Sequence, residues 1–128
     1  MPFVLDTNVV IGLRDGDEAL IEKFAALGEA TLISIVTRVE LEGGVYRDAA
    51  QVGVRRQRLD AILEALPVLA FDDAAADAYR AIVQSSGYSR RKVLDRMIAA
   101  QALVHRATLV TRNPADFRDV PGLEILAW

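Results

Sequence analysis

Cysteine is absent from this chain of 128 residues, and histidine occurs only once, as His105. Disulfide scaffolds, zinc ribbons, iron–sulfur sites and thiol nucleophiles are thereby excluded, and so is a metal centre built from several histidines. Any metal held by side chains needs oxygen ligands, which favours magnesium, manganese or calcium. We interpret His105 as a structural residue.

Long apolar runs are also missing. The apolar stretch from Ala30 to Val36 is far shorter than the roughly 20 residues needed to cross a bilayer. The N-terminus has no positively charged leader region, and Asp6 interrupts its apolar start. We therefore expect a cytoplasmic protein that makes no contact with a membrane.

The composition is that of one folded domain, residues 1–128. Apolar residues make up 52% and charged residues 26% of the chain, close to the average for globular proteins. A chain of this length buries enough surface to fold without a disulfide or a structural zinc. We expect neither a linker nor an internal repeat.

The net charge of −3 argues against a nucleic-acid partner, but the basic residues are unevenly distributed. One group is the segment Arg55–Arg58, and another comprises Arg90, Arg91, Lys92 and Arg96. Most of the 15 basic residues are arginine, which suits phosphate binding. An arginine-rich and alanine-rich composition also arises in a GC-rich genome, so both interpretations stay open.

Short apolar or β-branched runs alternate with helical patterns along the chain. This order predicts an α/β fold in which right-handed crossovers build a mostly parallel central sheet with helices on both faces. Strands are expected at Phe3–Leu5, Thr31–Ile35, Pro67–Phe71, Thr108–Thr111 and Leu123–Leu126. Helices are expected from Asp15 or Asp17 to Gly28, over Thr37–Tyr46, before Pro67, from Asp72 or Asp73 to Gly87, and over Ser89–Arg106, with a short turn or helix at Pro114–Phe117.

Acidic residues follow two of these strands directly. Ligands of open α/β sheets bind at the carboxyl ends of the strands, where Asp6 and Asp116 would emerge. Thr7 and Asn8 come next after Asp6 and can hydrogen-bond its carboxylate. Phe117 offers an anchor for the loop that carries Asp116. Taken singly, each aspartate could equally be a helix cap or a turn residue.

Two further acids lie on helix faces that should be buried. Glu40 shares its face with Val36 and two glycines, and Asp95 shares its face with apolar residues such as Ile98. A carboxylate in such a place needs a partner, because an unpaired buried charge is costly. The structural alternative is a salt bridge to an arginine.

The four acids Asp6, Glu40, Asp95 and Asp116 are expected at the same edge of the sheet. Like charges brought together repel, so such a cluster is stable only with cations between them. Coordination by oxygen alone fits Mg²⁺, with Mn²⁺ as a possible substitute, and such sites serve phosphoryl chemistry. Because His105 lies far along its helix from Asp95, water activated by the metal is the expected nucleophile.

Four blocks of sequence, in order, resemble the motifs of the PIN-domain family. They are Leu5–Asn8, Thr37–Leu41 with Gly43, Asp95–Ala100 and Thr111–Phe117. The chain is similar in size and motif style to the VapC-type ribonuclease toxins of bacterial toxin–antitoxin pairs. The resemblance implies a three-layer PIN-like fold, metal-binding catalytic carboxylates at Asp6, Glu40, Asp95 and Asp116, and supporting polar residues at Thr7, Asn8, Thr111 and Asn113.

The same resemblance implies an Mg²⁺-dependent endoribonuclease that forms a homodimer and is inhibited by a VapB-type antitoxin in a hetero-oligomer. We expect RNA phosphates to contact Arg90, Arg91, Lys92 and Arg96, and antitoxin residues to fill an apolar groove between residues 20–27 and 37–66. Arg55–Arg58 could contact acidic residues of that antitoxin, RNA or solvent. Many family members have a proline shortly before the third acid, and Ser89–Leu94 contains none.

Two other functions fit parts of the pattern. The first is a PIN-fold nuclease that processes RNA outside a toxin system. The second is a non-catalytic, receiver-like binding module, although this would need a pair of acids after the first strand, where the chain has Thr7 and Asn8. A dehalogenase-type phosphatase would need an aspartate at position 8.

Overall fold

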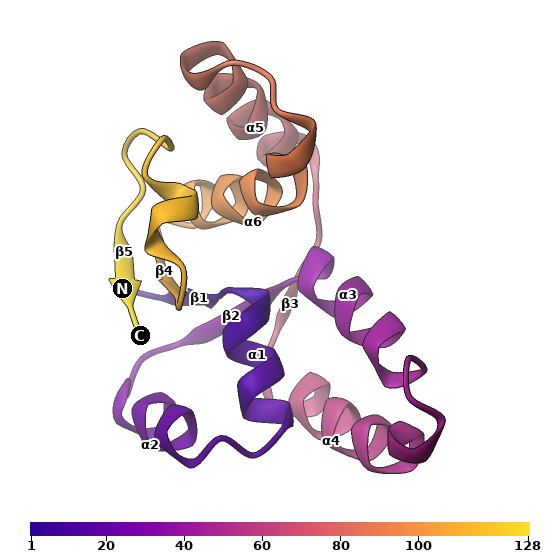
Figure 1. The fold of residues 1–128 in the computed structure, drawn as a ribbon. Coiled ribbons are helices and arrows are strands. Elements are labelled where there is room, and N and C mark those ends of the chain that lie inside the picture. Colours follow the sequence, from indigo (N-terminus) through magenta and orange to yellow (C-terminus); the bar gives the residue numbers. More distant parts are fainter.

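The protein is built on a five-stranded sheet in which all neighbouring strands run parallel (Figure 1). The computed structural model describes residues 1–128, and its strand order, β3-β2-β1-β4-β5, places β1 in the centre. The predicted parallel sheet is confirmed. Its strands are β1 (Phe3–Leu5), β2 (Thr31–Ser34), β3 (Val68–Leu69), β4 (Thr108–Thr111) and β5 (Ile125–Ala127).

Helices cover both faces of the sheet and complete the three layers that the sequence predicts. Helices α5 and α6 pack together on one face, and α1, α2 and α4 lie on the other (Figure 1). Helix α3 contacts α1 and α4 as well as α6, so it joins the two helical layers. The helices are α1 (Thr7–Arg14), α2 (Glu18–Ala26), α3 (Ile35–Val45), α4 (Val52–Ala65), α5 (Asp73–Ser86) and α6 (Val93–Val104), with 3-10 turns at Ala49–Gln51, Arg90–Lys92 and Pro114–Phe117.

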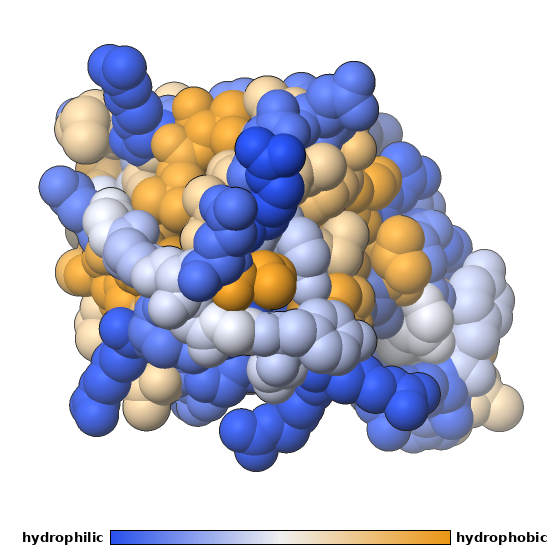
Figure 2. All heavy atoms as spheres, turned by 90° about the horizontal axis from the view of Figure 1, so that it is seen from above, coloured by the Kyte–Doolittle hydropathy of each residue, from blue (hydrophilic) through white to orange (hydrophobic).

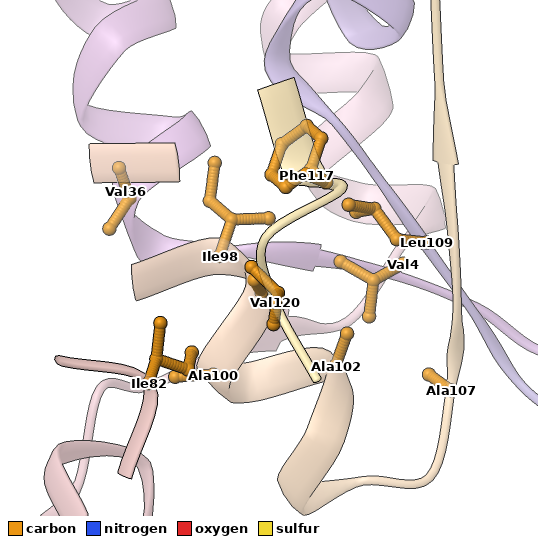
Figure 3. Close-up of a cluster of buried hydrophobic side chains, with 11 residues drawn as sticks. Val4, Val36, Ile82, Ile98, Ala100, Ala102, Ala107, Leu109, Phe117 and Val120 are labelled. Carbon is orange, nitrogen blue, oxygen red and sulfur yellow. The ribbon is translucent and has the colours of Figure 1, made fainter. Parts of the chain in front are cut away.

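Two hydrophobic cores form because successive side chains of a strand point to opposite faces. In β1, Val4 joins the core beneath α6, and Leu5 joins the core beneath α1, α3 and α4. Figure 3 shows the first core, in which Phe117 packs among side chains from β1, β4 and α6. Phe117 is 1% exposed, so the predicted anchor next to Asp116 is present.

The sequence patterns did not predict helix α1. It begins directly after Asp6, whose extended backbone and side chain cap the helix. Val9 and Val10, on the inner face of this helix, are fully buried. The segment is only eight residues long and includes Gly12, which weakens the helical signal.

Several other boundaries differ from those expected. Strand β3 covers only Val68–Leu69 and is shorter than the predicted strand Pro67–Phe71. Strand β2 ends at Ser34, because the Ser34 hydroxyl caps α3 by accepting from Val36 N and turns Ile35 into a helical residue. The helix predicted from Ser89 begins instead with a 3-10 turn, and the Ser89 side chain makes no capping bond. Strand β5 lies two residues later than predicted at its start.

The surface carries no element suited to span a membrane, because no helix is both long and apolar enough. Figure 2 views the molecule from the end where α5 lies. Hydrophilic side chains there surround and separate smaller hydrophobic areas. The exposed large apolar residues include Val39 and Leu94, on the two helices that also carry Glu40 and Asp95.

Candidate functional site

The four acidic residues singled out above line one cleft of about 600 Å³. The sheet and its helices bring them there from different parts of the chain. Asp6 follows β1, Glu40 lies on α3, Asp95 lies on the first turn of α6, and Asp116 lies in the 3-10 turn after β4. We call this the acidic cleft; Ile11 is its single hydrophobic lining residue.

Asp6 is the most enclosed of the four acids and is held by two hydrogen bonds. Its side chain is 5% exposed, with Oδ1 accepting from Thr7 N at 2.8 Å and Oδ2 accepting from Thr111 Oγ1 at 2.8 Å. Burial raises the pKa of Asp6 above its ordinary value, and the two hydrogen bonds oppose this rise. The carboxylate is therefore fixed in orientation between α1 and β4.

Glu40 is held by a chain of hydroxyl groups. Thr7 Oγ1 donates to Glu40 Oε1 at 3.0 Å and lies 2.9 Å from Thr37 Oγ1. Because a hydroxyl has one proton, Thr37 donates to Thr7 when Thr7 donates to Glu40. Glu40 takes part in no ion pair, so the alternative of a salt bridge to an arginine is not observed.

Asp95 experiences the crowding of like charges most strongly. Burial, followed by repulsion from Asp6, Asp116 and Glu40, raises its pKa to about 6. Lys92 lowers the pKa by a smaller amount, and no ion pair joins Asp95 to Arg91. The next turn of α6 is closely packed, because Ile98 and Ala99 are buried. The site therefore disfavours a negative charge at Asp95 unless a cation offsets it.

The oxygen atoms of the four acids are of the type that binds a hard divalent cation, but the side chains stand too far apart to surround a single ion. All candidate ligands are carboxylate oxygens, the type that Mg²⁺ and Mn²⁺ prefer. No three of the acidic side chains stand close enough together to hold one ion. Burial and, after it, repulsion from the neighbouring carboxylates raise the pKa of Asp95, and a cation between the carboxylates would relieve the repulsion.

The polar residues predicted to support the site occupy different places. Thr7 and Asn8 line the acidic cleft, and Thr111 is fully buried behind Asp6. Asn113 lines a neighbouring cleft together with Asn8 and Arg112. Its backbone N donates to Thr111 Oγ1 at 3.0 Å, so Asn113 supports Thr111 through the main chain.

Arg96 requires a correction as an RNA-binding candidate. Its side chain is buried, and it donates to Gly87 O at 2.6 Å and to Asp119 Oδ2 at 3.0 Å. These bonds tie α6 to the segments around it and leave the guanidinium unavailable to a phosphate. Lys92 also bonds Asp119, at 2.9 Å, but remains partly exposed. Arg91 and Lys92 line a small hollow with Asp95 and Asp116, and Arg90 is exposed.

The segment Arg55–Arg58 is not a free basic surface. Arg56 pairs with Glu42 at 2.7 Å and with Asp60 at 2.7 Å. Arg55 donates to Gly44 O at 2.9 Å, and Arg58 donates to Arg14 O at 3.1 Å. These bonds tie α4 to α3 and α1.

Sequence reasoning did not place three arginines in the acidic cleft, and it did not single out two of them, Arg14 and Arg47, at all. Arg14, Arg47 and Arg55 line the cleft at the end where α1 finishes. Arg14 was missed because helix α1 was not predicted. Had the helix been recognised, the position of Arg14 eight residues after Asp6 would have placed it near the C-terminal end of that helix.

Replacing Asp95 by asparagine is expected to stabilise the metal-free protein at neutral pH. The pKa of about 6, against an ordinary 3.8, means that the folded chain binds this proton more tightly than the unfolded chain. Stability contributed by the protonated group is present below about pH 4 and is lost as the pH rises through about 6. The variant avoids this loss and gains about 1 kcal/mol, once solvent screening of the partly exposed group is allowed for.

Urea unfolding in EDTA, at acidic and at neutral pH, measures this difference. Asp77→Asn, an exposed aspartate on α5, is the matched control and should change neither midpoint. A stabilisation by Asp95→Asn that is equal at both pH values would contradict the electrostatic explanation.

Comparisons with known proteins agree with this geometry. A PIN domain family model matches residues 3–123. Ribonuclease VapC1 of Rickettsia felis is 29% identical over 98% of this chain and 96% of its own length. Ribonuclease VapC2 of the same organism is 25% identical over 100% of this chain and 98% of its own length.

Solved structures show the same fold. The VapBC2 complex of Rickettsia felis, bound to a DNA fragment from its promoter, matches with a TM-score of 0.87 and 25% identity, covering 100% of this chain and 99% of the other. The DNA-bound VapBC of Salmonella typhimurium matches with a TM-score of 0.86 and 27% identity, covering 100% and 98%. The predicted resemblance to VapC-type proteins is confirmed, and the chain belongs to the PIN domain family.

Proposed function

We propose that this protein is an Mg²⁺-dependent endoribonuclease that acts in the cytoplasm as the toxin of a VapBC-type toxin–antitoxin pair. The observation that carries the proposal is the acidic cleft, in which Asp6, Glu40, Asp95 and Asp116 converge in a PIN domain. Relatives named ribonuclease VapC, matched along nearly their whole length, support RNA as the substrate.

A cation in this cleft would be held by some of the four carboxylates, with water completing its coordination, because no three of them stand close enough together to hold one ion. When bound, Mg²⁺ supplies activation of water and positive charge for the phosphate under attack. The chain's own contribution is orientation: Thr111 and Thr7 N hold the Asp6 carboxylate, and the Thr37–Thr7 hydroxyl pair holds Glu40. Fixing these side chains before substrate arrives lowers the cost of ordering them during the reaction. Mn²⁺ would suit the same oxygen ligands.

Arg91 and Lys92 are the best-placed of the predicted RNA contacts, because they stand beside Asp95 and Asp116. With only 6% aromatic residues, the chain offers few stacking platforms for bases, so phosphate contacts should dominate affinity.

We expect Arg90→Gln and Arg91→Gln together to weaken RNA binding and to reduce the slope of log affinity against log salt by about 1.4. Fluorescence anisotropy with a short single-stranded RNA measures both, and an unchanged slope would assign these arginines to solvent.

A VapB-type antitoxin is the proposed inhibitor, because the structures that match this fold include VapBC complexes. A basic side chain of the antitoxin could pair with the acidic cleft and compete with Mg²⁺. Three exposed apolar side chains offer contacts in the region predicted for the antitoxin. They are Ile21 on α2, Tyr46 directly after α3, and Val54 on α4.

We also propose a homodimer that uses an apolar groove between α3 and α6. The groove measures about 260 Å³ and is lined by five apolar residues and Glu40. Val39, at 65% exposed, and Leu94, at 50% exposed, stand on its two walls. Exposed apolar surface of this kind marks protein interfaces, and a two-fold dimer would cover the same groove on both copies. The apolar residues are Ile35, Val36, Val39, Leu94 and Met97.

The test of the proposed activity is direct. The purified protein is incubated with total cellular RNA in Mg²⁺ or in EDTA, and new 5′ ends are mapped by sequencing. We expect discrete new ends in Mg²⁺ alone. RNA that stays intact in Mg²⁺, with folded protein, would contradict the proposal.

A further inference from the structure

Arg14 stands out among the charged residues because it is buried and incompletely bonded. Its side chain is 5% exposed, yet it lines the acidic cleft. Arg14 Nε donates to Asp15 Oδ1 at 3.0 Å and Nη2 donates to Asp15 Oδ2 at 3.4 Å. No protein acceptor is found for Nη1, which is not sealed away from solvent. The free edge of a held guanidinium therefore faces the cleft.

The backbone of α3 makes room for this guanidinium. Gly44 lies beside it, and a Cβ at that position would stand 3.2 Å from Arg14 Nη1. Gly44 O accepts from Arg55 Nη1 at 2.9 Å, which brings a second guanidinium to the same place. Arg47, exposed and in no ion pair, follows on the same wall. Three arginines from three segments thus meet at one end of the cleft.

Acidic residues at this end are already engaged. Asp15 is paired with Arg14, and Asp48 caps a 3-10 turn by accepting from Ala50 N at 3.1 Å. The three arginines outnumber these two carboxylates, so this end of the cleft is positive. The other end holds Asp6, Glu40, Asp95 and Asp116. The cleft is therefore polarised along its length, with α1 running from the negative end to the positive end.

We infer that Arg14, with Arg47 and Arg55, binds a phosphate of the substrate RNA other than the one that is cut. This inference rests on the proposed ribonuclease function. Helix α1 separates Arg14 from Asp6 by eight residues, or about 12 Å along the helix axis at about 1.5 Å per residue. Arg14 forms no ion pair with Asp6, Glu40, Asp95 or Asp116, so we place the phosphate that it binds on a nucleotide next to the one that is cut.

Phosphate suits this pocket better than a cation or an apolar group. A guanidinium binds phosphate oxygens through charge-assisted hydrogen bonds, and Asp15 holds Arg14 in place before the ligand arrives. An arginine that is ordered in advance loses little side-chain entropy on binding. The arginine cluster would thus set the direction in which the RNA strand crosses the carboxylates.

The experiment measures binding in EDTA, so that cleavage is not required. The probe is a short, fluorescein-labelled, single-stranded RNA, titrated at several salt concentrations. Arg14→Gln should raise Kd about tenfold and reduce the slope of log affinity against log salt by about 0.7. Arg80→Gln is the matched control, because Arg80 is exposed on α5 and in no ion pair; it should leave the slope unchanged.

Arg47→Gln provides a second variant in case the loss of buried Arg14 unfolds the protein. Arg47 is exposed, so its replacement should preserve the fold while reducing the salt slope in the same way. Unchanged slopes for folded variants would overturn the inference, even if RNA is cleaved. If these variants instead lose affinity only for a polyglutamate peptide, the cluster serves an acidic protein partner and the inference is wrong. A wild-type protein that binds RNA but never cleaves it would contradict the proposed function and leave this result intact.

Discussion

Asp6→Asn and Asp95→Asn are each expected to abolish RNA cleavage while the chain remains folded. Both substitutions remove a carboxylate from the acidic cleft, where it is proposed to hold Mg²⁺. Loss of even an indirect support of a metal site costs about 10- to 100-fold, so removal of a ligand should cost more than about 100-fold. Initial rates on an RNA substrate, in Mg²⁺, Mn²⁺ and EDTA, measure the effect.

The design separates loss of chemistry from loss of fold. Asparagine at position 6 can still accept from Thr7 N through its amide oxygen and so preserve the cap of α1. Asp77→Asn, on the distant α5, removes the same charge and should cleave at the wild-type rate. Undiminished cleavage by the wild-type protein in EDTA would reject the metal mechanism.

Expression of the wild-type protein without a partner is expected to stop bacterial growth. An endoribonuclease that cuts essential RNA harms its host unless an inhibitor restrains it. Asp6→Ala should remove the toxicity without any antitoxin, and co-expression of a neighbouring antitoxin gene should restore growth to the wild-type strain. Growth curves after induction, with the amount of folded protein followed by immunoblot, provide the measurement.

One control is specific to this site. Alanine at position 6 also removes the cap of α1, at a cost of about 1 kcal/mol, so reduced accumulation could imitate lost toxicity. Asp95→Asn keeps the cap and should be equally harmless to the host. Normal growth while folded wild-type protein accumulates would instead favour a PIN-fold nuclease of RNA processing.

The sequence was sufficient where one residue's chemistry determined the local structure. The run Phe3–Leu5 predicted the central strand, and the position of Asp6 after it predicted a carboxylate at the edge of the sheet. Asp95 was identified from a helix face whose neighbours, Ile98 and Ala99, are indeed buried. Phe117 was recognised as an anchor because an aromatic residue beside a polar loop needs a core to enter.

The sequence was insufficient where partners distant along the chain decide the outcome. Arg96 sits next to Asp95, but Asp119 and Gly87 O hold it within the protein. Nothing local to Arg14 indicates that it meets Gly44 and Arg55, because the approach depends on how α1, α3 and α4 pack. Local pattern predicts which residues are polar, and tertiary packing decides which polar groups are already satisfied.

The two helices that line the groove, α3 and α6, also carry two of the candidate catalytic residues, Glu40 on α3 and Asp95 on α6. A second copy seated in that groove would fix the spacing of these two carboxylates. Occupancy of the groove and capture of the ion would then be thermodynamically linked, and each would strengthen the other by the same factor. The apparent affinity for Mg²⁺ would therefore rise with protein concentration, and a dilute sample would underestimate the affinity of the dimer.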